Sequence, residues 1–93
     1  MTITQSIIAD VLRSVDLESL IELGAPKDEY EPEARSIMEG VARLEEKGLS
    51  EERLAALIRT EWTSWFGPFS DDEIHVRIPR LRQIAHQIMT AHK

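Results

Sequence analysis

The sequence predicts an all-α protein, a small bundle of four main helices with an additional short helix after the first. Apolar residues recur at spacings of three and four along most of the chain, which is the periodicity of amphipathic helices. Residues typical of helix ends separate these stretches, and no stretch alternates with the period of two that a strand requires. Ninety-three residues fit one domain, so residues 1–93 are expected to form a single helical domain.

The first helix is expected to begin at Thr2, because Thr2 and Gln5 have the spacing of a capping box. Its apolar stripe continues to Val15. Asp16 then has the character of an N-cap, which predicts the additional short helix from Leu17 to Leu23. Glycine tolerates the left-handed backbone found after helix ends, so Gly24 is expected to stop this helix.

Two longer helices follow. Proline favours the first turn of a helix, so Pro32 places the next start near Glu31, and Lys47 with Gly48 closes that helix. Ser50 caps the following helix, which ends before the Gly-Pro pair at 67–68. Its inward face is expected to include both tryptophans of the chain, together with four other apolar residues: Leu54, Leu57, Ile58, Trp62, Trp65 and Phe66.

The last helix is expected to begin at Pro79. Proline has no N–H to donate and clashes with the preceding turn, so a break is predicted there, with a final helix running to about Ala91. Ser70 and Glu73 form a second capping-box pattern, which is typical of a short turn of helix before that break.

The charge of the chain limits its partners. Seventeen acidic and eleven basic residues give a net charge of −6, which disfavours nucleic acid. No apolar run is long enough to span a membrane, no secretion signal is evident, and there is no cysteine, so a cytoplasmic location is expected. The charge is uneven: residues 1–73 hold all 17 acids and 7 bases, a charge of −10, whereas residues 74–93 hold 4 bases and no acid, a charge of +4.

No set of residues predicts catalysis, a cofactor or a metal site. The acidic clusters at 28–33, 51–52 and 71–73 each fall at an expected helix start, where carboxylates stabilise the helix dipole. His75, His86 and His92 lack the spacing of a helical metal site. There is no nucleophile motif and no phosphate-binding glycine loop.

Some residues are nevertheless candidates for partner binding. Trp65 is either a core residue or a partly exposed interface anchor. The C-terminal arginines either reach carboxylates of the acidic body or offer a positive face to an acidic partner, a second copy of the chain included. Tyr30 is expected to be half-buried with its hydroxyl bonded, and Glu61 to be tied to an arginine or a tyrosine. The candidate partner-binding residues are Asp28, Glu29, Tyr30, Glu33, Trp65, Arg77, Arg80 and Arg82.

Three stretches of the chain also resemble a known family. They are the segment from Gly24 to Glu33, the Trp65-Phe66 pair and the Ile78-Pro79 pair. In this order they resemble the YugE-like family of small bacterial helical proteins, which has no assigned function. The chain departs from the family at Asp16, which has Val15 and Leu17 as neighbours in place of an aromatic residue and a proline. The resemblance implies a helical fold and carries no catalytic role.

Taken together, these patterns favour a non-catalytic protein-binding module with an unknown protein partner. One alternative is an immunity or inhibitor protein that neutralises a basic toxin domain, since small acidic helical proteins suit that partner electrostatically. Another is an enzyme that uses paired carboxylates, with or without a metal ion.

Overall fold

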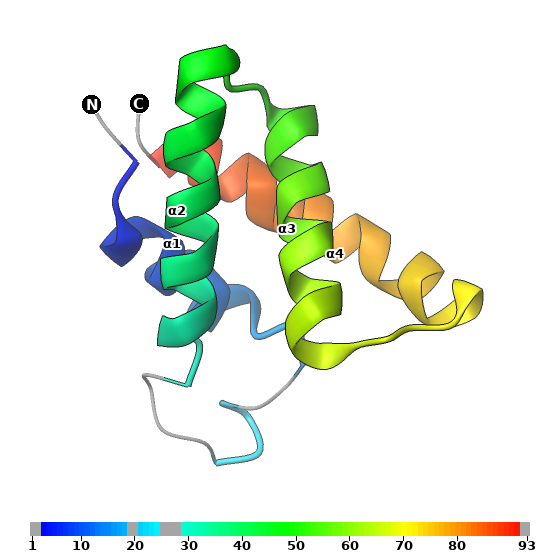
Figure 1. Ribbon diagram of the computed structural model, residues 1–93. Coiled ribbons are helices and arrows are strands. Elements are labelled where there is room, and N and C mark those ends of the chain that lie inside the picture. The colour runs from blue at the N-terminus through cyan, green and yellow to red at the C-terminus, as the bar shows by residue number, and fades with distance from the viewer. Residues whose placement is uncertain (1–2, 19–20, 25–28, 92–93) are drawn as a thin grey trace.

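The computed structural model describes residues 3–18, 21–24 and 29–91, and within these ranges it has four α-helices and no strand. The helices are α1 (Gln5–Val15), α2 (Glu31–Lys47), α3 (Glu51–Phe66) and α4 (Asp71–Ala91). Each helix contacts the next one along the chain, and α4 also contacts α1, so the four form a closed ring of neighbours. In Figure 1, α2 and α3 stand in front while α1 and α4 cross behind them. None of the helices in the described ranges is both long and apolar enough to cross a bilayer.

The first helix begins two residues later than a cap at Thr2 implies. Thr4 is the N-cap, and its hydroxyl accepts a hydrogen bond from the Ile7 N–H at 3.2 Å. Ile3 and Ile8, on either side of this cap, are both buried, as in a hydrophobic staple. The predicted capping residue Thr2 lies outside the described residues, so the capping box itself is not described.

The short helix predicted from Leu17 to Leu23 is wrong for the residues described there, which form turns. Asp16 does not start a helix but ends α1, with left-handed backbone angles (φ 47°, ψ 54°) and its N–H bonded to the Leu12 carbonyl. Its carboxylate accepts hydrogen bonds from the backbone N–H groups of Ile21 and Glu22 at 3.1 and 2.9 Å. These bonds hold Ile21 and Glu22 at the end of α1, whereas in a helix the same N–H groups would donate to backbone carbonyls four residues earlier.

The boundaries predicted for the two middle helices are confirmed. α2 starts at Glu31 with proline in its first turn and ends at Lys47, followed by Gly48 at φ 103°. Ser50 caps α3, and its hydroxyl accepts the Arg53 N–H at 3.1 Å. The N-cap of α2 is Tyr30, whose side chain makes no capping bond.

The last helix is longer than predicted, because α4 starts at Asp71 and passes through Pro79 without ending. The Ser70–Glu73 capping box forms in both directions, with each backbone N–H 3.2 Å from the other's side-chain oxygen. Pro79 leaves the His75 carbonyl without its helical donor, but both residues are exposed and water can replace that bond. Ile74 before the proline and Leu81 after it both pack on the core, and this packing favours a continuous helix.

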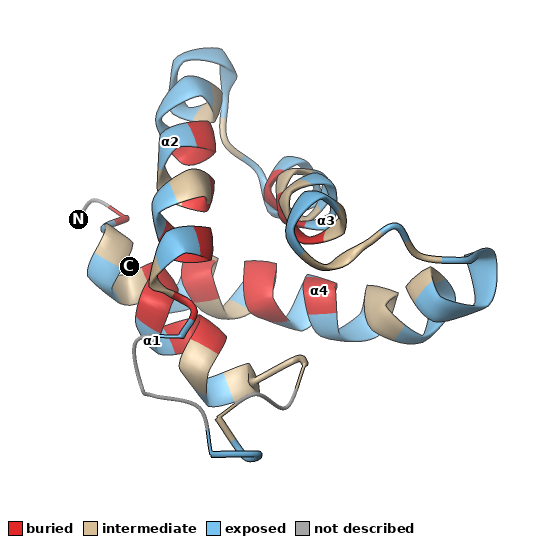
Figure 2. Ribbon diagram, turned by 60° about the horizontal axis from the view of Figure 1, so that its bottom comes forward, coloured by how far each residue is buried: buried red, intermediate tan, exposed pale blue. Residues whose placement is uncertain are grey.

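The core lies where the inner faces of the four helices meet, shown in red in Figure 2. Trp62 is its largest member, and its ring stacks on that of Tyr30 with centroids 5.8 Å apart. The Phe66 ring also packs against Trp62, with ring centroids 4.8 Å apart. Each of the four helices contributes to this core: Ile8, Ala9, Val11 and Leu12 from α1, Ala34, Ile37 and Val41 from α2, Leu54, Ile58 and Trp62 from α3, and Leu81, Ile84, Ala85 and Ile88 from α4.

Candidate functional site

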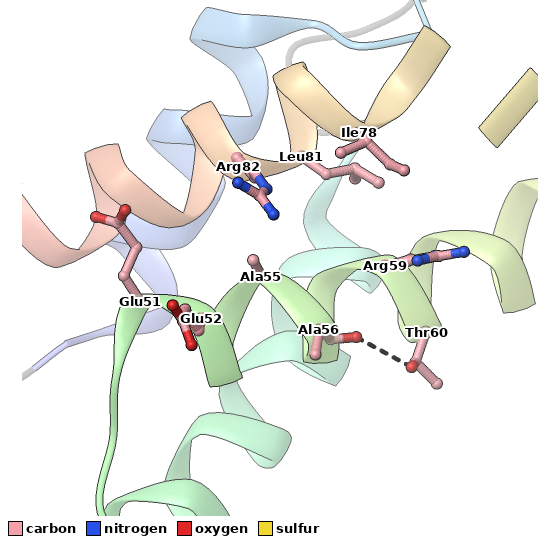
Figure 3. Close-up of a pocket in the computed structure, with 9 residues that line it drawn as sticks. All are labelled: Glu51, Glu52, Ala55, Ala56, Arg59, Thr60, Ile78, Leu81 and Arg82. Carbon is pink, nitrogen blue, oxygen red and sulfur yellow. Dashed lines mark hydrogen bonds between the residues drawn. The ribbon is translucent and has the colours of Figure 1, made fainter. Parts of the chain in front are cut away.

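An open groove of about 770 Å³ runs between α3 and α4. Apolar and charged side chains both line it, and Figure 3 shows Leu81 and Ile78 of α4 across from the alanines of α3. Six lining residues come from α3 and three from α4: Glu51, Glu52, Ala55, Ala56, Arg59 and Thr60, and Ile78, Leu81 and Arg82. Its volume falls within the range of binding clefts in proteins.

The α3 side of the groove follows from helical spacing. Leu54, Ile58 and Trp62 point into the core, so the opposite side of α3 turns outward. Ala56 is exposed on this outward side, and Ala55 beside it is partly buried against the core; both short side chains leave space for the groove. The Thr60 hydroxyl donates to the Ala56 carbonyl at 3.0 Å, so it is satisfied within the helix.

The acidic and basic side chains of the groove lie at different positions along α3. Glu51 and Glu52 stand at the helix start, and Arg59 stands two turns further on, as Figure 3 shows. His86 Nδ1 of α4 lies 2.8 Å from Glu51 Oε1. The side chains of Glu52, Arg59 and Arg82 make no hydrogen bond or ion pair with any residue in the described part of the chain. Their charges therefore face solvent beside the apolar residues of the groove.

The structure does not bring the predicted acidic candidates together as one surface. Asp28 lies outside the described residues, and Glu29 is exposed. Tyr30 is fully buried rather than half-buried, and its hydroxyl donates to Asp16 Oδ1 at 2.6 Å, as expected of a bonded hydroxyl. Glu33 is only 6% exposed, so neither Tyr30 nor Glu33 is available to a partner in this conformation.

The other candidates lie in three different settings. Trp65 is 47% exposed, so of its two expected places the partly exposed one is found and the core one is not, because the buried stripe of α3 ends at Trp62. Arg82 lines the groove, and Arg80 is exposed on α4. Arg77 is engaged within the fold, as the sequence expects of an arginine that reaches a carboxylate of the acidic body.

Glu18 is the partner of Arg77, and the sequence did not indicate it. Its carboxylate accepts two hydrogen bonds from Arg77, at 2.9 and 2.8 Å, and a third from the Trp62 indole N–H at 2.8 Å. The Arg77 hydrogen bonds hold the pKa of Glu18 below its ordinary value of 4.5. Together these contacts tie the segment after α1 to both α3 and α4. We call Glu18, Trp62 and Arg77 the Glu18 clamp.

The sequence analysis predicted a side-chain partner for Glu61, whereas the structure gives one to Glu18. Glu61 was expected to bind an arginine or a tyrosine, but its side chain makes no hydrogen bond or ion pair with any residue that the structure describes. Glu18 stands alone among apolar residues between Leu17 and Ile21, apart from one serine. That isolation is the local signal that could have pointed to a partnered acid.

Burial of the Glu33 carboxylate is energetically unfavourable in this fold. One of its carboxylate oxygens, Oε2, is buried without a hydrogen-bond partner. Burial raises the pKa of Glu33, and the nearby charge of Glu29 raises it further. No group of three or more His, Cys, Asp or Glu residues in the described ranges is arranged to hold a metal ion.

No family model, curated protein or solved structure matches this chain. The fold and the groove define a class only, a small all-α protein with an open groove between its last two helices. The resemblance to the YugE-like family stays a prediction.

Proposed function

We propose that this chain is a non-catalytic protein-binding module and that the groove between α3 and α4 is its binding surface. The observation that carries the proposal is the composition of the groove: apolar residues bordered by charged side chains, of which those of Glu52, Arg59 and Arg82 make no hydrogen bond or ion pair with a described residue. Protein interfaces commonly combine an apolar centre with a polar, charged rim.

The arginines of the groove support the same proposal. Arg59 and Arg82 stand on opposite walls, one on α3 and one on α4. Arginine is enriched at protein interfaces and at their energetic centres, because its planar guanidinium can bind a carboxylate with two hydrogen bonds. The stretch of α3 that lines the groove, residues 51–60, is about 15 Å long at the rise of an α-helix. A partner helix of a few turns matches that length.

A photoreactive residue placed in the groove tests the proposal. Thr60 is exposed and lines the groove, so benzoylphenylalanine in its place should form a covalent protein adduct in cells that produce the chain. Ala42 is exposed on α2 and lies outside the groove, so the same residue at position 42 is the matched control. A discrete adduct from position 60 and none from position 42 supports the proposal. Equal labelling from both positions, or no adduct from position 60, contradicts it.

An inhibitor of a basic toxin domain remains the second candidate. Its support is the net charge of −6 and the exposure of Asp71, Asp72 and Glu73 in the first turn of α4. That partner would contact the acidic helix starts rather than the groove. The photoreactive residue in place of Asp72 would then give the stronger adduct, and the yield would fall steeply with added salt.

A further inference from the structure

The outward face of α3 is complementary to itself when turned end for end. Glu52 and Arg59 are seven residues apart, which is about two turns, so they lie on one side of the helix. Ala55 and Ala56 stand midway between them. A second α3 lying antiparallel across this midpoint would set Glu52 beside the partner's Arg59 and Arg59 beside the partner's Glu52. The two alanines would meet each other at the crossing.

We propose that the occupant of the groove is a second copy of this chain, joined through an antiparallel pairing of α3 about a twofold axis near Ala55 and Ala56. The inference rests on the proposed function, because it names the partner of the same groove. A twofold interface repeats every contact, so one charge pair in the sequence supplies two ion pairs in the dimer.

The small side chains at the midpoint make this arrangement sterically accessible. Helices approach most closely where the residues at their crossing are small, and Ala56 is exposed at the middle of the groove. Ile78 on the α4 wall is partly exposed and offers apolar surface to the incoming helix. A parallel pairing would place Glu52 against the partner's Glu52, and that repulsion disfavours it.

The charges themselves are free for this role. Glu52 and Arg59 are both exposed, and neither makes an ion pair within the described residues. By contrast, Arg53 on the same helix turn as Glu52 is already used, since it donates to the carbonyls of Lys47 and Gly48 at 2.9 Å. The unused pair is therefore the pair that the antiparallel arrangement brings together.

Charge reversal tests the proposal with three proteins. Sedimentation or light scattering at a series of concentrations should show the wild-type chain passing from monomer to dimer. Glu52→Arg alone puts arginines against arginines, and Arg59→Glu alone puts glutamates against glutamates. The dimer dissociation constant of each variant should therefore rise by about tenfold or more. An equimolar mixture of the two variants restores both opposite-charge pairs and should recover dimer of wild-type strength. Recovery also shows that both variants are folded.

The matched control reverses an equivalent pair away from the groove. Glu39 and Arg43 are exposed on α2, and Glu39→Arg or Arg43→Glu should leave dimerisation unchanged. A wild-type chain that stays monomeric at every concentration overturns the dimer, as does a dimer that ignores reversal at 52 and 59. The photoreactive residue at position 60 separates the two proposals. An adduct of twice the mass of the chain identifies the second copy. An adduct of any other mass leaves the groove as a binding site but refutes self-association.

Discussion

Removing the guanidinium of Arg77 should weaken the fold far more than removing that of its neighbour Arg80. Arg77→Met keeps most of the length of the side chain but removes both hydrogen bonds to Glu18. It also removes the cation 4.2 Å above the Phe69 ring. Arg80→Met is the matched control, because Arg80 is exposed on the same helix and makes no such bond.

The magnitude follows from the geometry of the Glu18 clamp. Hydrogen bonds to a charged group contribute about 1.5–3 kcal/mol when they are shielded from water. The side chains of Arg77 and Glu18 are 22% and 15% exposed, so water can partly replace the lost donors, and we expect about 2 kcal/mol for the pair. The cation over the Phe69 ring adds about 0.5 kcal/mol. The Arg77→Met variant should lose about 2–3 kcal/mol, whereas surface changes such as Arg80→Met stay within about 0.5 kcal/mol.

Urea unfolding at neutral pH, followed by circular dichroism, measures both variants against the wild-type chain. The pH dependence gives an independent check. The pKa of Glu18 is lowered in the folded state, so its stabilisation is complete above the ordinary value of 4.5 and is lost as pH falls through the lowered pKa. The gap between wild type and Arg77→Met should therefore shrink in acid. Equal stability of the two arginine variants, or a gap that does not change with pH, would refute the reasoning.

Three further substitutions probe other features of the fold. Pro79→Ala should stabilise the protein by about 1–3 kcal/mol, because alanine restores the N–H donor to the His75 carbonyl. This gain is reduced by the smaller stabilisation that proline gives by restricting the unfolded chain. A lower melting temperature would contradict this expectation. Glu33→Met should raise the free energy of unfolding at pH 7 by about 1 kcal/mol by removing a buried acid whose pKa is raised, and urea titrations should show this gain fading below the ordinary glutamate pKa. Gly67→Ala should cost more than about 1 kcal/mol in the same assay, because its Cβ would lie 2.5 Å from the Thr63 carbonyl oxygen; a variant as stable as wild type would disprove that contact.

The parts of the fold that were predictable from sequence are those with local causes. Ser50 and Gly48 act on backbone groups within a few residues of themselves, so the bounds of α2 and α3 could be predicted from spacing alone. The same holds for the all-helical class, which depends only on periodicity. Local rules failed at Asp16, since its side chain bonds Tyr30, which lies 14 residues away. They failed at Pro79 because packing on both sides of the proline outweighed its local preference.

The candidate site was less accessible to sequence reasoning than the fold. The groove is formed by α3 and α4 together, and Arg82 was singled out only for its charge, without its neighbours on α3. The Glu18 clamp joins residues that are 44 and 59 positions apart. Such contacts depend on how helices cross, and no spacing in a single segment encodes them. The sequence left Trp65 open between the core and a partly exposed place for a related reason: the apolar periodicity continues to the end of α3, but it does not show which residues the other helices cover.

The contact between α1 and α4 has a consequence for the order of events during synthesis. The closed ring needs both α1 and α4, because Leu81, Ile84 and Ile88 of α4 complete the core that α1 begins. During synthesis the apolar face of α1 therefore stays partly uncovered until α4, the last of the four helices to be translated, has left the exit tunnel. Until then the nascent chain should expose α1 to chaperones, and the core should close only once α4 is free to pack on it.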